Sequence, residues 1–145
     1  MTEVVGAKIV AEHWPLSGPH SEESLASATE AIDELVRYLA HATIANQAAE
    51  ALPFAPDGYI VISRLATAAH AQDQVLRQLA DWADNHLAAD PNLRHDTEPA
   101  DRASVTALEA SAYLNDAANK AGELGRALAR AQGLLGHLYH DQDNE

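Results

Sequence analysis

The chain has 145 residues, no cysteine and a formal net charge of −13, from 22 acidic and 9 basic residues. The missing cysteines exclude disulfides and any zinc site built on sulfur, and a surface this acidic repels nucleic acids and anionic membranes, so we expect neither as a partner. The length favours one domain, residues 1–145, and without a secretory leader or an apolar run of about 18 residues we expect it in the cytoplasm.

The first 20 residues are apolar but lack a clear period. Val4, Val5, Ile9, Val10 and Trp14 fit neither the alternation of a strand nor the stripe of a helix. The pattern leaves a strand, a short helix and an extended arm open. We expect residues 1–20 to form an arm that lies against the bundle or against a second subunit, with Trp14 as its contact residue.

Residues 21–51 are predicted to form the first long helix. Ser21 is a suitable N-cap, acidic residues follow it, and Pro53 cannot continue a helix. Apolar residues then recur at steps of three and four, which is the spacing of an amphipathic helix. The predicted stripe contains Leu25, Ala28, Ile32, Leu35, Leu39, Ala42, Asn46 and Ala49.

The stretch "LPFAPDG", residues 52–58, predicts a corner between two antiparallel helices. Asp57 is the expected N-cap of a second helix over residues 58–89. We expect Phe54 to plug this end of the core, and Phe54 and Tyr59 to be interaction residues. The second helix is predicted to face inward with Val61, Leu65, Ala68, Gln72, Val75, Leu76, Leu79, Trp82, Ala83, His86 and Leu87.

A polar, proline-bearing loop separates the second helix from a third one, predicted over residues 101–140. Its predicted stripe contains Val105, Leu108, Ala112, Asn115, Ala118, Gly122, Gly125, Leu128, Gln132, Leu135 and Tyr139. Four glycines inside one helix each cost up to about 1 kcal/mol relative to alanine. We therefore expect Gly122, Gly125, Gly133 and Gly136 to allow a neighbouring backbone to approach closely, with a kink or a frayed end as the alternative.

These elements predict an all-α fold: an antiparallel bundle of three long helices over residues 21–140, an N-terminal arm and an acidic tail over residues 141–145. Alanine at many inward positions buries little apolar area, and a dimer would ease that shortfall. We therefore predict a non-catalytic protein–protein interaction or assembly module that associates with itself and with an unidentified protein. We expect no cofactor and no metal.

Two Arg–His spacings support an alternative reading as an enzyme. "RLATAAH", from Arg64 to His70, and "RAQGLLGH", from Arg130 to His137, resemble the pattern of small helical HEPN-type ribonucleases, in which imidazole and guanidinium meet at a dimer cleft. About one such match is expected by chance, and the polar residue that commonly follows the arginine is missing. This alternative implies a ribonuclease or a toxin–antitoxin component, with Arg64 and His70 as the catalytic pair.

The C-terminal stretch "YHDQD", from Tyr139 to Asp143, matches the Tyr-x-x-x-Asp signal of proteins exported by actinobacterial type VII systems. Those proteins also carry Trp-x-Gly or Pro-Glu in the turn of a helical hairpin, whereas the turn here is "LPFAPDG". A second alternative is therefore a secreted helical protein.

The segment "AEALPFAPDGYIVISRLATAAHAQDQVLRQLADW" resembles a group of small alanine-rich actinobacterial proteins that accompany mobile elements. The similarity covers residues 35 to 88 and contains no catalytic signature. It implies a helical fold and an accessory role.

Overall fold

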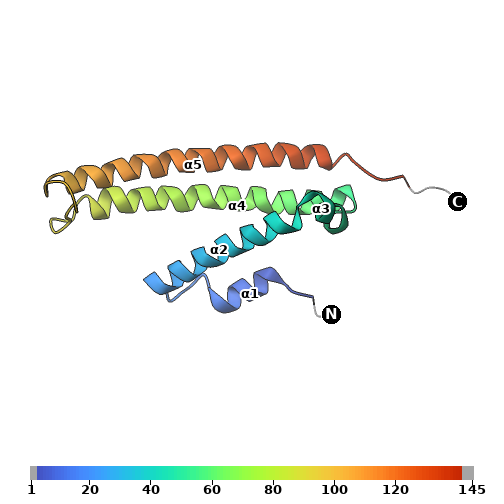
Figure 1. The fold of residues 1–145 in the computed structure, drawn as a ribbon, viewed down its shortest axis with the longest axis horizontal. Coiled ribbons are helices and arrows are strands. Elements are labelled where there is room, and N and C mark those ends of the chain that lie inside the picture. The colour runs from blue at the N-terminus through green and yellow to red at the C-terminus, as the bar shows by residue number, and fades with distance from the viewer. Residues whose placement is uncertain (1–2, 142–145) are drawn as a thin grey trace. The chain divides into compact units, whose positions relative to one another are not determined.

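The computed structural model describes residues 3–141, and over that range it contains helices and no strand. In chain order the elements are α1 (Gly6–His13), α2 (Glu22–Ala42), α3 (Ala45–Ala51), α4 (Ala55–Asp81), the π-helical segment η1 (Trp82–Leu87) and α5 (Arg102–Leu135) (Figure 1). The all-α class expected from the sequence is thus confirmed. Contacts between residues divide the chain into an N-terminal unit, Met1–Pro53, and a C-terminal unit, Phe54–Glu145.

The N-terminal unit begins with a short helix, which is one of the three conformations that the sequence leaves open for residues 1–20. A turn follows α1, and within it Gly18 has a φ of +84°, a conformation that favours glycine. Ser21 caps α2 as predicted. Its Oγ accepts the N–H of Ser24 at 3.1 Å, and the Oγ of Ser24 accepts the N–H of Ser21 at 2.9 Å.

The single helix predicted over residues 21–51 is wrong, because the structure breaks it after Ala42. The hydroxyl of Thr43 donates to the carbonyl of Leu39 at 2.7 Å, and Ile44 is extended, with φ −62° and ψ 141°. A threonine that bonds back to the preceding turn competes with the helical ladder and bends the chain. Helix α3 then starts in a new direction at Ala45.

At the corner, α4 starts three residues earlier than predicted. Phe54 is the N-cap residue, Pro56 lies in the first turn where its missing N–H costs nothing, and Asp57 is the third helical residue. The carboxylate of Asp57 accepts the N–H of Phe54 at 3.1 Å. Asp57 therefore stabilises the start of α4 from within the helix and does not cap it.

The loop between η1 and α5 is held by its own side chains. The guanidinium of Arg94 donates to the carbonyls of Pro91 and Leu93 at 2.8 and 2.9 Å. The Nδ1 of His95 accepts the N–H groups of Thr97 and Glu98 at 3.1 and 3.0 Å. These bonds shape the turn that reverses the chain.

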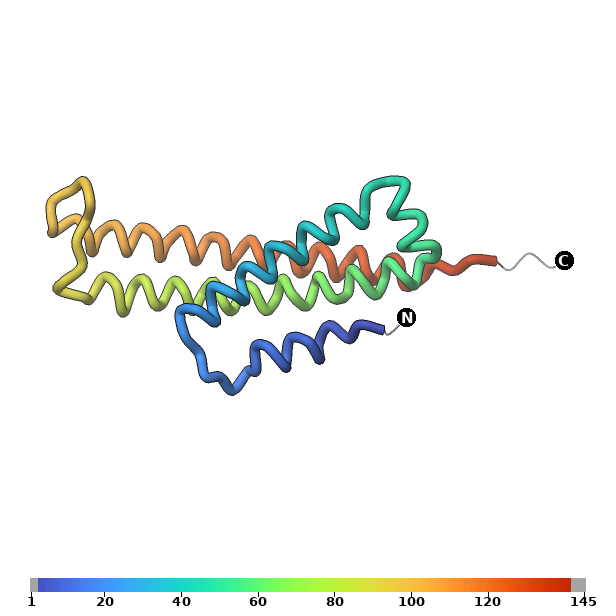
Figure 2. Tube along the Cα trace, turned by 60° about the horizontal axis from the view of Figure 1, so that its bottom comes forward, coloured from blue at the N-terminus to red at the C-terminus, as the bar shows by residue number. Residues whose placement is uncertain are grey.

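Helices α4 and α5 run antiparallel and side by side in both views (Figures 1 and 2). The continuous helical stretch from Ala55 ends at Leu87, against the predicted residue 89. Helix α5 ends at Leu135 and not at residue 140, because the chain turns through Gly136 and His137. The two predicted long helices of the C-terminal half are therefore present as a hairpin.

The core of this hairpin is built from small side chains. The buried residues are Ala66, Ala69, Ala80, Ala83, Ala103, Ala107, Ser111, Ala118, Ala121, Gly122 and Gly125. No large side chain among residues 3–141 is completely buried, and helices α1, α2 and α3 contain no buried residue. The hairpin thus uses alanine and glycine inside and leaves its larger apolar groups outside.

Candidate interaction surfaces

Helices α4 and α5 meet along what we call the inner seam, in which buried and half-buried residues alternate at steps of three and four. This is the heptad spacing of a coiled coil. On α4 and η1 the seam contains Ile62, Ala66, Ala69, Asp73, Leu76, Ala80, Ala83 and Leu87; on α5 it contains Ala107, Ser111, Leu114, Ala118, Ala121, Gly125, Leu128, Gln132 and Leu135. The inward face predicted for the second helix is therefore wrong by one residue along most of its length. On α5 the predicted stripe coincides with buried or half-buried positions from Ala118 to Leu135. The predicted inward residues that are instead exposed are Leu108, Ala112, Asn115 and, beyond the helix, Tyr139.

Three polar contacts cross or flank the inner seam. The buried hydroxyl of Ser111 donates to the carbonyl of Ala80 at 2.9 Å, and Arg77 donates to the side-chain oxygen of Asn119 at 2.8 Å. The Nε of Arg77 also lies 2.7 Å from Oδ1 of Asp73, as an ion pair whose geometry falls outside that of a hydrogen bond. Sequence reasoning did not find this cluster, although Asp73 and Arg77 have the i, i+4 spacing of a helical ion pair.

The four glycines that the sequence places in the third helix do not share one role, and Gly136 lies just after the end of α5. A Cβ on Gly125 would lie 2.7 Å from the ring of His70, and one on Gly122 would lie 3.1 Å from the carboxylate of Asp73. These two glycines make room for side chains of α4, whereas the sequence predicts close approach of a backbone. At Gly136 the nearest side chain is that of Tyr59, at 3.4 Å, and at Gly133 no heavy atom lies within 4 Å, so this glycine does not serve a contact.

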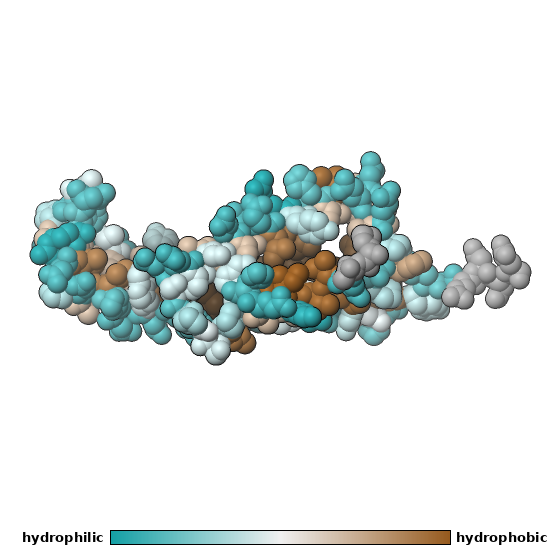
Figure 3. Space-filling view, turned by 90° about the horizontal axis from the view of Figure 1, so that it is seen from below, coloured by the Kyte–Doolittle hydropathy of each residue, from teal (hydrophilic) through white to brown (hydrophobic). Residues whose placement is uncertain are grey.

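A second stripe lies on another face of α4 and ends at the first residue of η1. We call it the outer stripe, and it contains Leu65, Ala68, Gln72, Val75, Leu79 and Trp82. All six are exposed, and the exposed fractions of Val75 and Trp82 are 50% and 49%. Their steps of three and four match the heptad spacing of the inner seam. Hydrophobic side chains are also visible among hydrophilic ones on the face that Figure 3 presents. The outer stripe contains most of the residues that the sequence placed inside.

Helix α2 has a similar exposed stripe, and it includes Leu25, Ile32, Leu35 and Val36. The exposed fractions of these four side chains lie between 57% and 64%. Trp14, the predicted contact residue of the arm, is half-buried and stands against His13, with ring centroids 5.8 Å apart. The N-terminal unit therefore presents an apolar helix face with no core of its own beneath it.

Phe54 does not plug the core as predicted, since 57% of its surface is exposed. Its ring meets His140 edge-on at a centroid distance of 5.2 Å, and Nε2 of His140 accepts the N–H of Ala55 at 3.0 Å. Pro53 and Pro56 restrict the backbone on either side of Phe54. The ring of Phe54 lies beside His140 of the C-terminal segment. Tyr59 lines a hollow at the same end of the hairpin together with Leu135 and Leu138.

Helix α4 does not bring together Arg64 and His70, the catalytic pair of the enzyme alternative. Arg64 and His70 are six residues apart, so they lie about 120° apart around the helix and about 9 Å apart along it. The ring of His70 covers Gly125. Among residues 3–141 no group of three or more histidine, aspartate or glutamate side chains is placed to hold a metal ion. The ribonuclease reading stays a prediction.

Tyr139, the first residue of the predicted export signal, is 84% exposed. The last residue of that signal, Asp143, and most of the predicted acidic tail lie outside the described residues. Among residues 3–141 no helix is both long enough and apolar enough to cross a bilayer.

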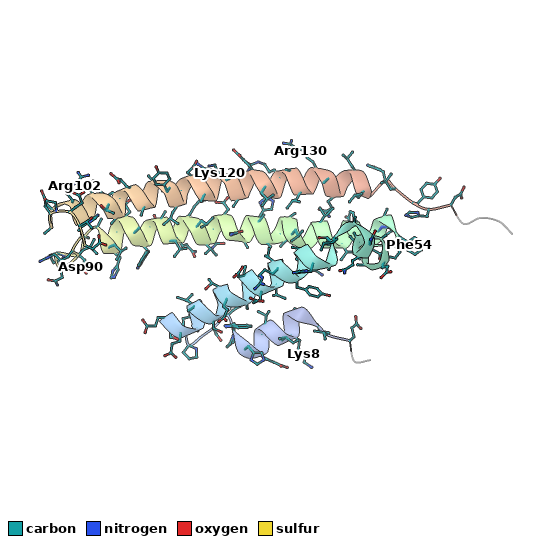
Figure 4. The ribbon with its side chains drawn as sticks, in the orientation of Figure 1. Lys8, Phe54, Asp90, Arg102, Lys120 and Arg130 are labelled. Atoms are coloured by element: carbon teal, nitrogen blue, oxygen red, sulfur yellow. The ribbon has the colours of Figure 1, made fainter. Side chains whose placement is uncertain are left out.

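Charge is distributed unevenly along the chain. Helices α4 and α5 together carry six basic and six acidic residues, whereas α2 carries one arginine against five acidic residues. Lys120 and Arg130 lie on the side of α5 that faces away from α4 (Figure 4). The Nζ of Lys120 donates a hydrogen bond to the carboxylate of Asp116 at 2.9 Å, and this contact raises the pKa of Lys120 above its usual value. The two long helices are thus balanced in charge, whereas η1 and the loop that join them carry five acidic residues and one basic residue.

The chain matches no protein-family model, and comparisons with curated proteins and with solved structures found no match. A function for this chain is therefore inferred from the arrangement of the described residues. This arrangement contains two exposed apolar helix faces, on α2 and on α4.

Proposed function

We propose that the protein is a non-catalytic helical interaction module that associates with itself and with a further protein that its sequence does not identify. The observation that supports this most is the outer stripe of α4, where leucine, valine and tryptophan are exposed while alanines fill the core. Large apolar side chains at regular spacing on a helix surface are the feature by which helices recognise one another.

Two arrangements would cover the exposed stripes. In the first, α2 joins α4 and α5 in the antiparallel bundle of three helices that the sequence predicts, with residues 1–20 as an arm. In the second, copies of the chain associate. Both remove the stripes from water, and an area term of about 25 cal/mol per Å² favours each of them.

Sedimentation velocity over a hundredfold range of concentration tests self-association. We expect the mass to rise from that of one chain toward that of a dimer, and the melting temperature to rise with it, because association stabilises the folded form by mass action. A single-chain mass at every concentration up to the high micromolar range would contradict the proposal.

A further inference from the structure

We propose that residues 136–140, which follow α5, form a latch that sets where α4 begins. With the latch closed, α4 begins at Ala55, as in the structure. With the latch open, it begins at Gly58 with Asp57 as its N-cap, which is the start that the sequence predicts. This inference goes beyond the proposed function and does not depend on self-association.

Two contacts with His140 hold the first turn of α4 in the closed state. The Nε2 of His140 accepts the N–H of Ala55 at 3.0 Å, and its ring meets that of Phe54 edge-on, with 5.2 Å between the centroids. Phe54 is the N-cap residue, but its side chain accepts no hydrogen bond there. The imidazole of His140 therefore takes the place of the cap that α4 lacks, from a position 85 residues further along the chain.

Apolar contacts with α4 accompany this hydrogen bond. At Gly136, where the latch leaves α5, the nearest side chain is that of Tyr59, 3.4 Å from the position of a Cβ. The N–H of Leu138 donates to the carbonyl of Leu135 at 3.0 Å, which turns the chain at this point. Leu138 and Pro56 then line the same hollow, so the latch lies beside the first turn of α4.

The local sequence opposes the closed start. Ala55 is helical although it precedes Pro56, and the residue before a proline is disfavoured in the helical conformation. Aspartate is among the best N-cap residues, whereas phenylalanine is not a capping residue. A start at Gly58 would leave Ala55 extended and let the carboxylate of Asp57 accept the N–H of Ile60.

The two starts use the carboxylate of Asp57 in different ways. In the closed state it accepts the N–H of Phe54 at 3.1 Å, from the third position of the helix, and in the open state it would cap the helix itself. The connection between α3 and α4 would lengthen from residues 52–54 to residues 52–57. Detaching the C-terminal segment would thus alter the connection between the two units of the chain.

NMR spectra of the full-length chain test the latch through the Cα chemical shifts of residues 55–57. In His140→Ala these shifts should move from helical toward coil values by half or more, because only the local preferences then remain. The shifts from Ile60 onward should stay helical. His137→Ala, at an exposed position of the same segment, is the matched control and should leave residues 55–57 helical.

A second variant supplies the cap locally. Serine at the N-cap position does what His140 does in the wild type, so residues 55–57 should stay helical in the double variant Phe54→Ser/His140→Ala. This rescue separates the choice of helix start from a general loss of stability, which the double variant would not repair.

The inference would be overturned if residues 55–57 were as helical in His140→Ala as in the wild type, or if Phe54→Ser failed to restore them. Loss of helical shifts beyond Ile60 in His140→Ala would also contradict it, because α4 would then have no second start at Asp57. These outcomes leave the proposed self-association untouched, since that is measured by mass.

Discussion

Replacing Gly125 with alanine tests the contact by which α4 reaches into α5. The new Cβ would lie 2.7 Å from Cε1 of His70 and 2.9 Å from each ring nitrogen, which is closer than real Cβ atoms approach. Gly133, on the same helix, has no heavy atom within 4 Å of the corresponding position. Gly133→Ala is therefore the matched control.

The two substitutions share one gain and differ in one cost. Alanine stabilises a helix interior by about 1 kcal/mol relative to glycine, and somewhat less in the last turn, so Gly133→Ala should raise the free energy of unfolding by about 0.5 to 1 kcal/mol. At Gly125 the overlap with His70 adds an overpacking cost of about 1 to 3 kcal/mol. The net effect of Gly125→Ala should be between about zero and 2 kcal/mol of destabilisation.

Removing the ring by His70→Ala should abolish that cost. In this background Gly125→Ala should stabilise by about 1 kcal/mol, which makes the coupling energy between the two positions about 1 to 3 kcal/mol. The coupling energy is measured by urea unfolding, monitored by circular dichroism at a helical wavelength, of the wild type, Gly125→Ala, His70→Ala and the double variant. Gly133→Ala is unfolded in the same way as the control. A coupling below about 0.5 kcal/mol, or equal stabilisation by the two glycine substitutions, would refute the placement of His70 over Gly125.

Three further predictions concern other contacts. Ala118→Leu adds a large side chain at a position with no exposed surface, so urea unfolding should show a loss of about 1 to 3 kcal/mol; an unchanged midpoint would mean that the inner seam is wider than described. Ser21→Ala removes the cap of α2, which should destabilise the start of this helix by about 1 kcal/mol and speed amide hydrogen exchange in its first turn. Equal exchange rates in the variant and the wild type would argue against the capping contact. His140→Ala removes the acceptor of the Ala55 N–H, so this amide should exchange with solvent faster in NMR spectra; an unchanged exchange rate would argue against the contact.

The sequence predicts the helices well and their buried faces poorly. High alanine content, the cap at Ser21 and the polar loop after Asp90 all reflect local chemistry, and the structure contains the corresponding helices, cap and turn. The inward face of α4 is missed because large apolar residues are normally the better guide to a core. Here Leu65 and Leu79 are outside, and the neighbouring Ala66 and Ala80 are buried.

Other differences arise from side-chain contacts that one-dimensional patterns do not record. Thr43 ends α2 by bonding to the preceding turn, within a stretch whose stripe continues unbroken through Asn46 and Ala49. Gly125 is explained by a histidine 55 positions away in the chain. The candidate surface was visible in the sequence as a stripe with the right spacing, but only the structure assigns it to the outside of the hairpin.

The alanines of the inner seam do little to distinguish one register of the hairpin from another. Alanines recur along both helices, so sliding one helix by a heptad would again set small residues against small residues at nearly the same apolar burial. Two specific contacts do not survive such a slip: Arg77 would leave Asn119 and meet either Ala112 or Arg126, and the ring of His70 would leave Gly125 and meet either Ala118 or Gln132. One hydrogen bond between side chains and the space that Gly125 leaves for a histidine ring therefore favour the observed register over a slip by a heptad.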